Sequence, residues 1–152
     1  MTTGNRLFTE EQRQTLTAVL DRIIPAEGES PSAGSLGLVP RIENAVSQNP
    51  RQRRTFMEGL AQLDIATARQ GDALFLDLTD DAKDAALRDI ESQFSAFFEL
   101  LVRQCYNEYY TNSSVFESIG YSLPDSTTYE PRPFDESLLE PQRQRSPFWR
   151  RA

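Results

Sequence analysis

The sequence offers few side chains that could act as nucleophiles, proton carriers or metal ligands. It contains one cysteine, Cys105, and no histidine. A Ser-His-Asp or Cys-His nucleophile pair therefore cannot form within the chain, and neither can a Cys/His zinc site or a haem held by histidine. The glycines form neither a GxGxxG nor a P-loop pattern, so no phosphate cradle is predicted. Carboxylates and tyrosines are the remaining groups that could do chemistry.

The densest group of carboxylates lies between residues 77 and 91. Asp80 and Asp81 follow Thr79, a residue that caps helices well, and carboxylates are favourable at the positive end of a helix dipole. The stretch lacks the spacing and the turn glycine of a calcium-binding hand. We interpret it as the solvated face of a well-capped helix, and the alternative is a divalent-metal site or a carboxylate enzyme built from the acidic region 64–140. The group consists of Asp77, Asp80, Asp81, Asp84, Asp89 and Glu91.

The sequence predicts helices as the elements that would position these carboxylates and tyrosines. Thr9 and Gln12 form a capping box, and the helix that follows should stop before Pro25. Residues 25–37 have the composition of a loop, and further helices should begin near Pro40, at Asn49-Pro50 and after Thr79. No alternating apolar and polar run of useful length occurs. The pattern predicts an all-α fold, a small bundle of about five helices.

The strongest helical periodicity falls between residues 94 and 109. Eight apolar residues recur there at the spacing of a long helix that faces the core. Cys105 is one of them, and no Lys or His lies near it in the sequence. A buried small hydrophobic residue is therefore a better interpretation than a reactive thiol. The eight are Phe94, Phe97, Phe98, Leu101, Val102, Cys105, Tyr106 and Tyr109.

The net charge of −7 on 152 residues is distributed unevenly. Residues 1–63 are neutral, residues 64–140 carry −11 and residues 141–152 carry +4. The acidic balance argues against nucleic acid as a partner, since phosphate contacts require clustered Lys and Arg. No apolar stretch is long enough to span a bilayer. The start of the sequence shows no export signal, which makes the cytoplasm the expected location.

The last thirty-one residues have an unusual composition. Five of the nine prolines lie there, among large apolar side chains that a disordered tail normally lacks. We predict a helical body over residues 1–121 and an extended proline-rich arm over residues 122–152 that wraps a partner. The alternative is that the arm folds back on its own body. Its large apolar residues are Leu123, Tyr129, Phe134, Leu138, Leu139, Phe148 and Trp149.

Several stretches of the body resemble one known family. The series is Phe8–Gln12 running into Leu20–Ala26, then Gly59–Asp64, Phe97–Leu101, and Glu108–Asn112 leading to Ile119–Tyr121. Taken in this order, the stretches resemble the gluconate 2-dehydrogenase subunit 3 family over about residues 8–121.

This resemblance implies a function in a heteromeric oxidoreductase. Members are small non-catalytic subunits of bacterial dehydrogenases, whose large partner is a glucose-methanol-choline-type flavoprotein that carries FAD and oxidises sugars or alcohols. The chain would then bind and stabilise that partner and assist its maturation, with no catalytic, cofactor-binding or metal-binding residue of its own. Gly120 would adopt a positive φ and Tyr121 would pack at the interface. The expected partner-binding residues are Tyr109, Tyr110, Tyr121, Tyr129, Phe134, Leu138, Leu139, Phe148 and Trp149.

The resemblance leaves two alternatives open, one about the lifetime of the complex with the flavoprotein and one about its cellular location. A transient chaperone would release the flavoprotein once FAD is bound, whereas a permanent subunit would stay. Many members of the family are exported with a twin-arginine leader, and the sequence shows none. Periplasmic location would then require co-export with the partner or removal of a leader.

Overall fold

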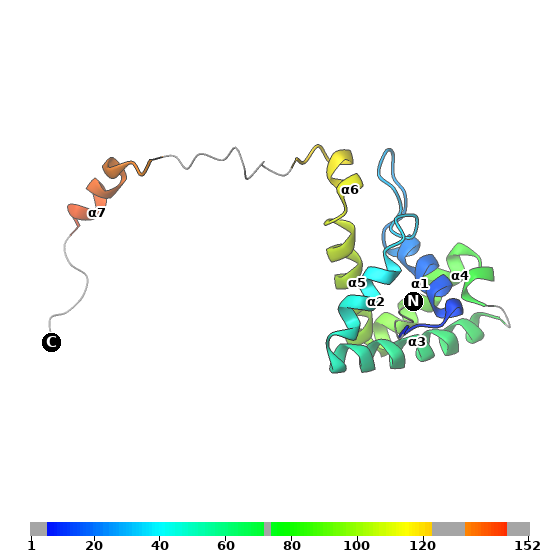
Figure 1. Ribbon diagram of the computed structural model, residues 1–152. Helices are drawn as coiled ribbons and strands as arrows, with labels where there is room; N and C mark the ends of the chain where they lie inside the picture. The colour runs from blue at the N-terminus through cyan, green and yellow to red at the C-terminus, as the bar shows by residue number, and fades with distance from the viewer. Residues whose placement is uncertain (1–5, 72–73, 123–132, 146–152) are drawn as a thin grey trace, which may run out of the picture. The chain divides into compact units, whose positions relative to one another are not determined.

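The computed structural model describes residues 6–71, 74–122 and 133–145. By its contacts the chain divides into two units, Met1–Ser122 and Leu123–Ala152. Within the described residues all regular structure is helical except for an isolated bridge between Glu27 and Ser30. The predicted all-α fold is confirmed (Figure 1).

Of the first three helices, α1 and α3 begin at the capping residues that the sequence predicts. Helix α1 (Glu10–Ile23) starts with the Thr9–Gln12 capping box, and α3 (Pro50–Gln70) is capped by Asn49, whose side chain accepts two backbone hydrogen bonds. Between them, α2 (Val39–Ser47) starts one residue before the predicted Pro40. The side chain of a capping residue satisfies amides that the helix itself leaves without acceptors.

The second half of the body contains three helices and one short turn. A 3₁₀ turn, η1 (Phe75–Asp77), leads into α4 (Asp80–Gln93), which Thr79 caps as predicted. Helix α5 (Ser95–Tyr109) follows almost without a break, and the short α6 (Ser113–Ser118) is capped by Asn112. Helix α3 packs against both α4 and α5, so these three helices enclose much of the core.

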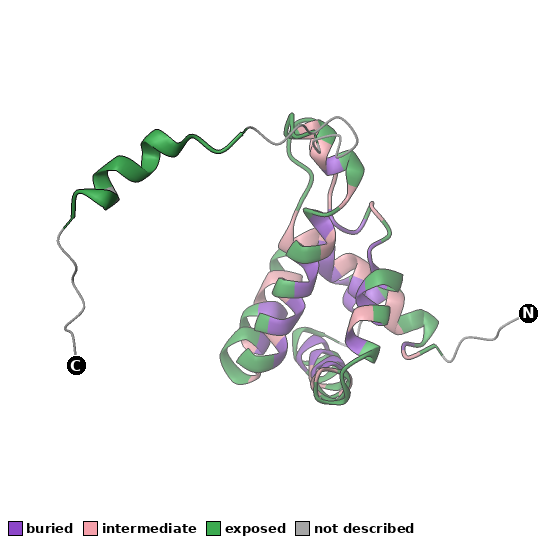
Figure 2. Cartoon of the chain, turned by 60° about the vertical axis from the view of Figure 1, so that its left-hand side comes forward, coloured by how far each residue is buried: buried purple, intermediate pink, exposed green. Residues whose placement is uncertain are grey.

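The core consists of the inward faces of these helices (Figure 2). Phe56 lies at its centre, stacked on Phe8 at 5.7 Å between ring centroids and edge-on to Phe97 at 5.3 Å. Helix α3 buries one face of helical spacing, made of Phe56, Leu60, Leu63 and Thr67. Aromatic pairs in these geometries add to the stabilisation that burial of their area gives.

The core-facing stripe predicted for α5 is confirmed for four of its eight residues, partly confirmed for Phe94 and Phe98, which pack against the core, and wrong for Tyr106. Phe97, Leu101, Cys105 and Tyr109 are buried as expected, but Tyr106 is exposed. Phe94, Phe98 and Val102 are only half-buried. The buried face is instead completed by Leu100 and Gln104. Eight apolar residues cover a wider arc of the helix than one helix–helix contact can bury. One row of residues, spaced by four, therefore lies at the edge of the buried face: Phe94, Phe98, Val102 and Tyr106.

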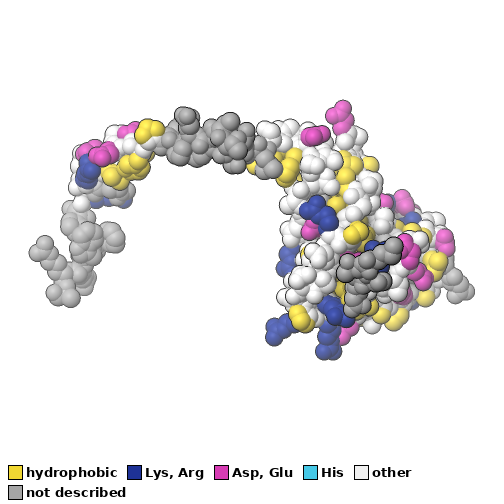
Figure 3. All heavy atoms as spheres, viewed as in Figure 1, with side chains coloured by type: hydrophobic (Ala, Val, Ile, Leu, Met, Phe, Trp, Pro, Cys, Tyr) yellow, Lys and Arg dark blue, Asp and Glu magenta, His cyan; other side chains and the backbone are white. Residues whose placement is uncertain are grey.

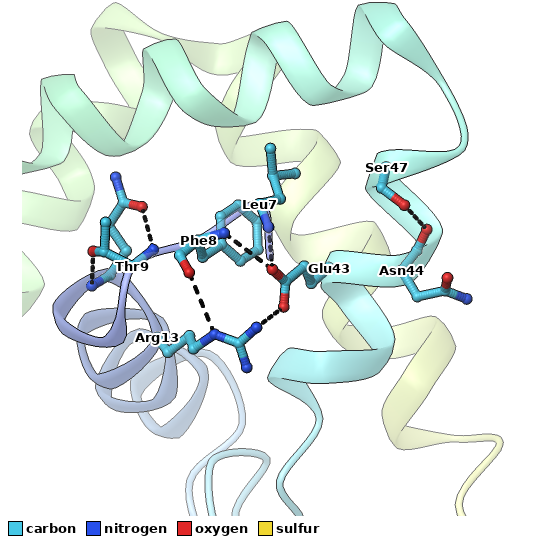
Figure 4. A network of polar contacts seen from close by, with 8 residues as sticks. Leu7, Phe8, Thr9, Arg13, Glu43, Asn44 and Ser47 are labelled. Atoms are coloured by element: carbon cyan, nitrogen blue, oxygen red, sulfur yellow. Dashed lines mark hydrogen bonds and ion pairs between the residues drawn. The ribbon is translucent and has the colours of Figure 1, made fainter. Parts of the chain in front are cut away.

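A buried carboxylate joins the segment before α1 to α2 (Figure 4). Glu43 accepts hydrogen bonds from the amides of Leu7 at 2.6 Å and Phe8 at 3.0 Å, and it forms an ion pair with Arg13. Its side chain is 10% exposed. We call this group of contacts the Glu43 network; it holds Phe8 in place against Phe56.

The described part of the second unit is short and helical. Residues 136–143 form a 3₁₀ turn, η2 (Glu136–Leu139), followed by α7 (Glu140–Arg143). The prediction of an extended arm therefore does not hold for these residues. Asp135 caps the turn by accepting a hydrogen bond from the amide of Ser137 at 2.9 Å, and Arg143 pairs with Glu136 and Glu140.

Among the described residues, no helix combines the length and the apolar character needed to cross a membrane.

Candidate functional site

Cys105 is buried in the second half of α5. Burial raises the pKa of its thiol to about 12, because the thiolate would lose its hydration there. A thiol in this state is a poor nucleophile and a poor metal ligand. Its position agrees with the interpretation of Cys105 as a small core residue.

The acidic stretch that begins α4 is tied to α1 by one arginine. Arg22 donates to Asp84 through two nitrogens, at 2.8 and 2.9 Å, and to Asp80 at 2.8 Å. Hydrogen bonds from Arg22 lower the pKa of the Asp84 carboxyl below its usual value. Within the described ranges no group of three or more His, Cys, Asp or Glu residues is arranged to hold a metal ion. The contacts of Asp80 and Asp84 join two helices.

The edge row of α5 forms an apolar groove with α1 and α4. Phe98, Val102 and Tyr106 line it from α5, opposite Ile23 and Leu87. The groove has a volume of about 320 Å³ and carries charged groups at its rim, namely Arg22, Asp84, Arg88 and Glu91. Sequence reasoning assigned its α5 residues to the core. The signal that could have identified them is the spacing of four residues from Phe98 through Val102 to Tyr106.

Exposed tyrosines continue this surface towards α6. Tyr106 and Tyr110 stack with 5.9 Å between ring centroids, and they are 42% and 50% exposed. Tyr121 is also half exposed and packs on Phe116. Tyr109 differs, because its ring is buried and its hydroxyl donates to the Pro31 carbonyl at 2.8 Å. Of the predicted partner-binding residues in the body, Tyr110 and Tyr121 are thus accessible and Tyr109 is not.

Three predicted partner-binding residues lie around η2 and α7. Phe134 and Leu138 are 67% and 68% exposed, and Leu139 is 37% exposed. Apolar side chains gather on one side of this segment in Figure 3. Tyr129, Phe148 and Trp149 lie outside the described residues. Of the predicted partner-binding residues in this unit, Phe134, Leu138 and Leu139 are thus accessible.

Comparison with known proteins identifies the family. A family model described as gluconate 2-dehydrogenase subunit 3 matches residues 10–124. The chain belongs to the gluconate 2-dehydrogenase subunit 3 family. No curated protein and no solved structure matches the chain. The family description makes it a subunit of a multi-subunit dehydrogenase.

The stretches that resemble the gluconate 2-dehydrogenase subunit 3 family contain close contacts of the scaffold. In the stretch 59–64, Gly59 lies directly under the ring of Phe97, and a Cβ there would stand 2.0 Å from the ring. In the stretch 20–26, Asp21 accepts a hydrogen bond from the Gly34 amide at 2.8 Å. Glycine at both positions permits an approach that a side chain would block.

The last of these stretches forms the end of the body. Arg41 pairs with Glu108 at 2.6 Å, and Gly120 has a φ of +68°. The amide of Tyr121 donates to the Phe116 carbonyl at 2.8 Å and that of Gly120 to the Glu117 carbonyl at 3.1 Å. These bonds and the Phe116–Tyr121 contact make a Schellman motif, which ends a helix at a residue with positive φ. The positive φ predicted for Gly120 is confirmed.

Proposed function

We propose that this chain is a non-catalytic accessory subunit that binds and stabilises a large FAD-dependent sugar or alcohol dehydrogenase. The observation that carries the proposal is the family match over residues 10–124, since the family is that of a dehydrogenase subunit. FAD and the reaction belong to the large subunit in this proposal. The small subunit contributes surface, and its assistance to maturation follows from stabilising the partner's fold.

The chemistry of the described residues supports a role without catalysis. Cys105 is buried, with its pKa raised to about 12. Asp80 and Asp84 are engaged by Arg22, and Glu43 by Arg13 and two amides. Groups that hold a scaffold together in this way have lost the freedom that acid–base catalysis requires. These contacts support the proposal that the chain acts by binding.

Two exposed apolar surfaces support the proposal of a large partner. The first consists of exposed tyrosines of the body, the stacked pair Tyr106 and Tyr110 together with Tyr121 after α6, and the second is the segment of Phe134, Leu138 and Leu139. Aromatic and aliphatic residues of this size dominate the binding energy of protein interfaces when a partner covers them. A short amphipathic helical turn suits an apolar groove of the partner.

Co-expression with a flavoprotein dehydrogenase from the same organism tests the proposal. We expect a complex that co-purifies and a large subunit that retains FAD and activity longer than it does alone. Truncation after Tyr121 should weaken the complex by about a hundredfold or more, because three apolar anchors are lost at about 1–2 kcal/mol each. Recovery of both chains as separate, equally stable and active monomers would refute the proposal.

Matched substitutions locate the contact more finely. Phe134→Ser combined with Leu138→Ser should weaken the complex, whereas Ile65→Ser combined with Leu74→Ser should not. Ile65 and Leu74 are exposed apolar residues of the body with 48% and 54% exposure, and the proposal gives them no contact with the partner. The lifetime of the complex after FAD loading then distinguishes a permanent subunit from a transient chaperone.

A further inference from the structure

Four arginines surround the start of α3, and three of them, Arg6, Arg53 and Arg54, line two adjoining hollows there. Arg51, Arg53 and Arg54 lie in the first turns of α3, and Arg6 lies before α1. All four are exposed, and Arg6 and Arg53 line the same hollow. Figure 3 shows dark blue side chains gathered at the lower edge of the body, where α3 begins. We call Arg6, Arg51, Arg53 and Arg54 the basic face.

The positive charge of the basic face has little compensation within the chain. Only Arg54 has an ion-pair partner among the described residues, Glu58 at 2.7 Å, and the first turn of α3 contains no acidic residue. The described part of the molecule likewise shows no hydrogen bond from the guanidinium groups of Arg51 and Arg53. Cations near the positive end of a helix dipole destabilise the helix. These arginines therefore lower the stability of the isolated chain.

Two adjoining hollows give the basic face a shape. Their volumes are about 230 and about 310 Å³, and both are lined by Ser47, Arg53 and Met57. Leu7 adds apolar surface to the first hollow and Pro50 to the second. A methionine thioether adapts its shape to different apolar groups. Arg6, Arg53 and Arg54 thus place guanidinium groups at the rim of an apolar floor, whereas Arg51 lies at the start of the same helix and lines neither hollow.

Charge identifies the kind of partner that fits. Guanidinium groups bind carboxylates with two parallel hydrogen bonds. A nucleic acid or an anionic membrane is a long negative surface, and residues 64–140 with their net charge of −11 would repel it. A short acidic segment of a protein meets only the basic face. The hollows over Met57 accept an apolar side chain of the same segment.

We propose that the basic face docks an acidic segment of the large dehydrogenase subunit. Carboxylates of that segment bind Arg53 in the hollows and the other arginines around the start of α3, and an apolar neighbour covers Met57. This inference rests on the proposed function, whose partner it names, and it adds the surface and the chemistry of contact.

The test compares two charge-matched double variants of the full chain. In the first, Arg51→Gln and Arg53→Gln remove two charges of the basic face. In the control, Arg69→Gln and Arg103→Gln remove two exposed charges elsewhere. The affinity of each variant for the purified large subunit is measured at about 0.05 M and about 0.5 M salt. The distance over which charges interact, the Debye length, differs several-fold between these two concentrations.

We expect the Arg51/Arg53 variant to bind about tenfold more weakly at low salt, and the difference to shrink at high salt. The control should bind within about twofold of the original chain at both salt concentrations. The melting temperature of the isolated Arg51/Arg53 variant should stay equal or rise, since two unfavourable charges leave the start of α3. Weaker binding together with an equal or higher melting temperature distinguishes a docking role from a structural one.

Each other outcome overturns the inference. Equal affinity of the two variants refutes it while the proposed function stands. Failure of the original chain to bind the large subunit refutes both. A lower melting temperature of the Arg51/Arg53 variant shows that the arginines serve the chain's own fold. Lost binding to anionic vesicles or to duplex DNA, with unchanged binding to the large subunit, assigns the face to another partner.

Discussion

Substitution of Glu43 by alanine should unfold the body at markedly lower denaturant. The change removes the acceptor of two backbone amides and the ion-pair partner of Arg13, whose side chain is only 17% exposed. Breaking a buried pair costs about 3–5 kcal/mol, because a charge stays behind without a partner. Arg13 retains some access to water, so we expect about 3 kcal/mol.

This loss is large relative to the stability of an ordinary domain, which is about 5–15 kcal/mol. For a chain of this size it corresponds to a melting temperature lower by about 10 °C. Urea unfolding followed by circular dichroism measures the free energy directly. Amide hydrogen exchange at Leu7 and Phe8 should accelerate more than exchange in α4, because the Glu43 network holds the segment before α1.

Two comparisons make the prediction specific. Glu43→Gln keeps one acceptor oxygen and should cost about half as much. Arg54→Ala removes an exposed pair with Glu58 and should change stability by less than about 0.5 kcal/mol. The double variant Arg13→Ala, Glu43→Ala should be more stable than the sum of the single changes predicts. A loss below about 0.5 kcal/mol for Glu43→Ala, or strict additivity, would refute the reasoning.

Two further changes test other contacts of the scaffold. Gly59→Ala should destabilise the body by about 2 kcal/mol in urea unfolding, since overpacking against Phe97 outweighs the gain in helix propensity, and Phe97→Leu in the same chain should restore part of the loss. The folded-state pKa of Asp84 is lowered by Arg22, so its stabilising contribution is complete above the unfolded pKa of about 4 and disappears as pH falls through the lower folded value. The original chain should therefore lose more stability than Asp84→Asn on acidification below about pH 4, and parallel curves would contradict this assignment.

The helices were predictable because their signals are local. Thr9, Asn49 and Thr79 cap helices through side chains that contact amides two or three residues ahead, so the sequence contains both partners of each bond. The buried face of α3 was predictable for a similar reason, since one apolar row matched one buried side. The apolar stripe of α5 was broader than its buried side, and periodicity alone does not show where burial ends.

Long-range polar contacts could not be predicted. Glu43 lies 35 residues from Phe8, and Arg22 lies 62 residues from Asp84, so no local pattern connects them. The basic face could not be predicted for the same reason, because Arg6 and Arg53 line one hollow only when the segment before α1 packs near α3. One sign of the basic face was nevertheless visible in the sequence: three arginines occur within four residues at the start of a helix, without an acid between them.

The Glu43 network and the basic face share the segment before α1, and this connects stability to binding. The Leu7 amide is held by Glu43, and Leu7 lines the same hollow as Arg6, Arg53 and Met57. Loss of the network would release Arg6 from this hollow and lower stability at the same time. Loss of Arg51 and Arg53 would weaken docking without loosening the core, since neither side chain contributes to it. If loss of the network lowers both stability and docking, and loss of Arg51 and Arg53 lowers docking alone, then the scaffold and the binding surface meet at residues 6 and 7.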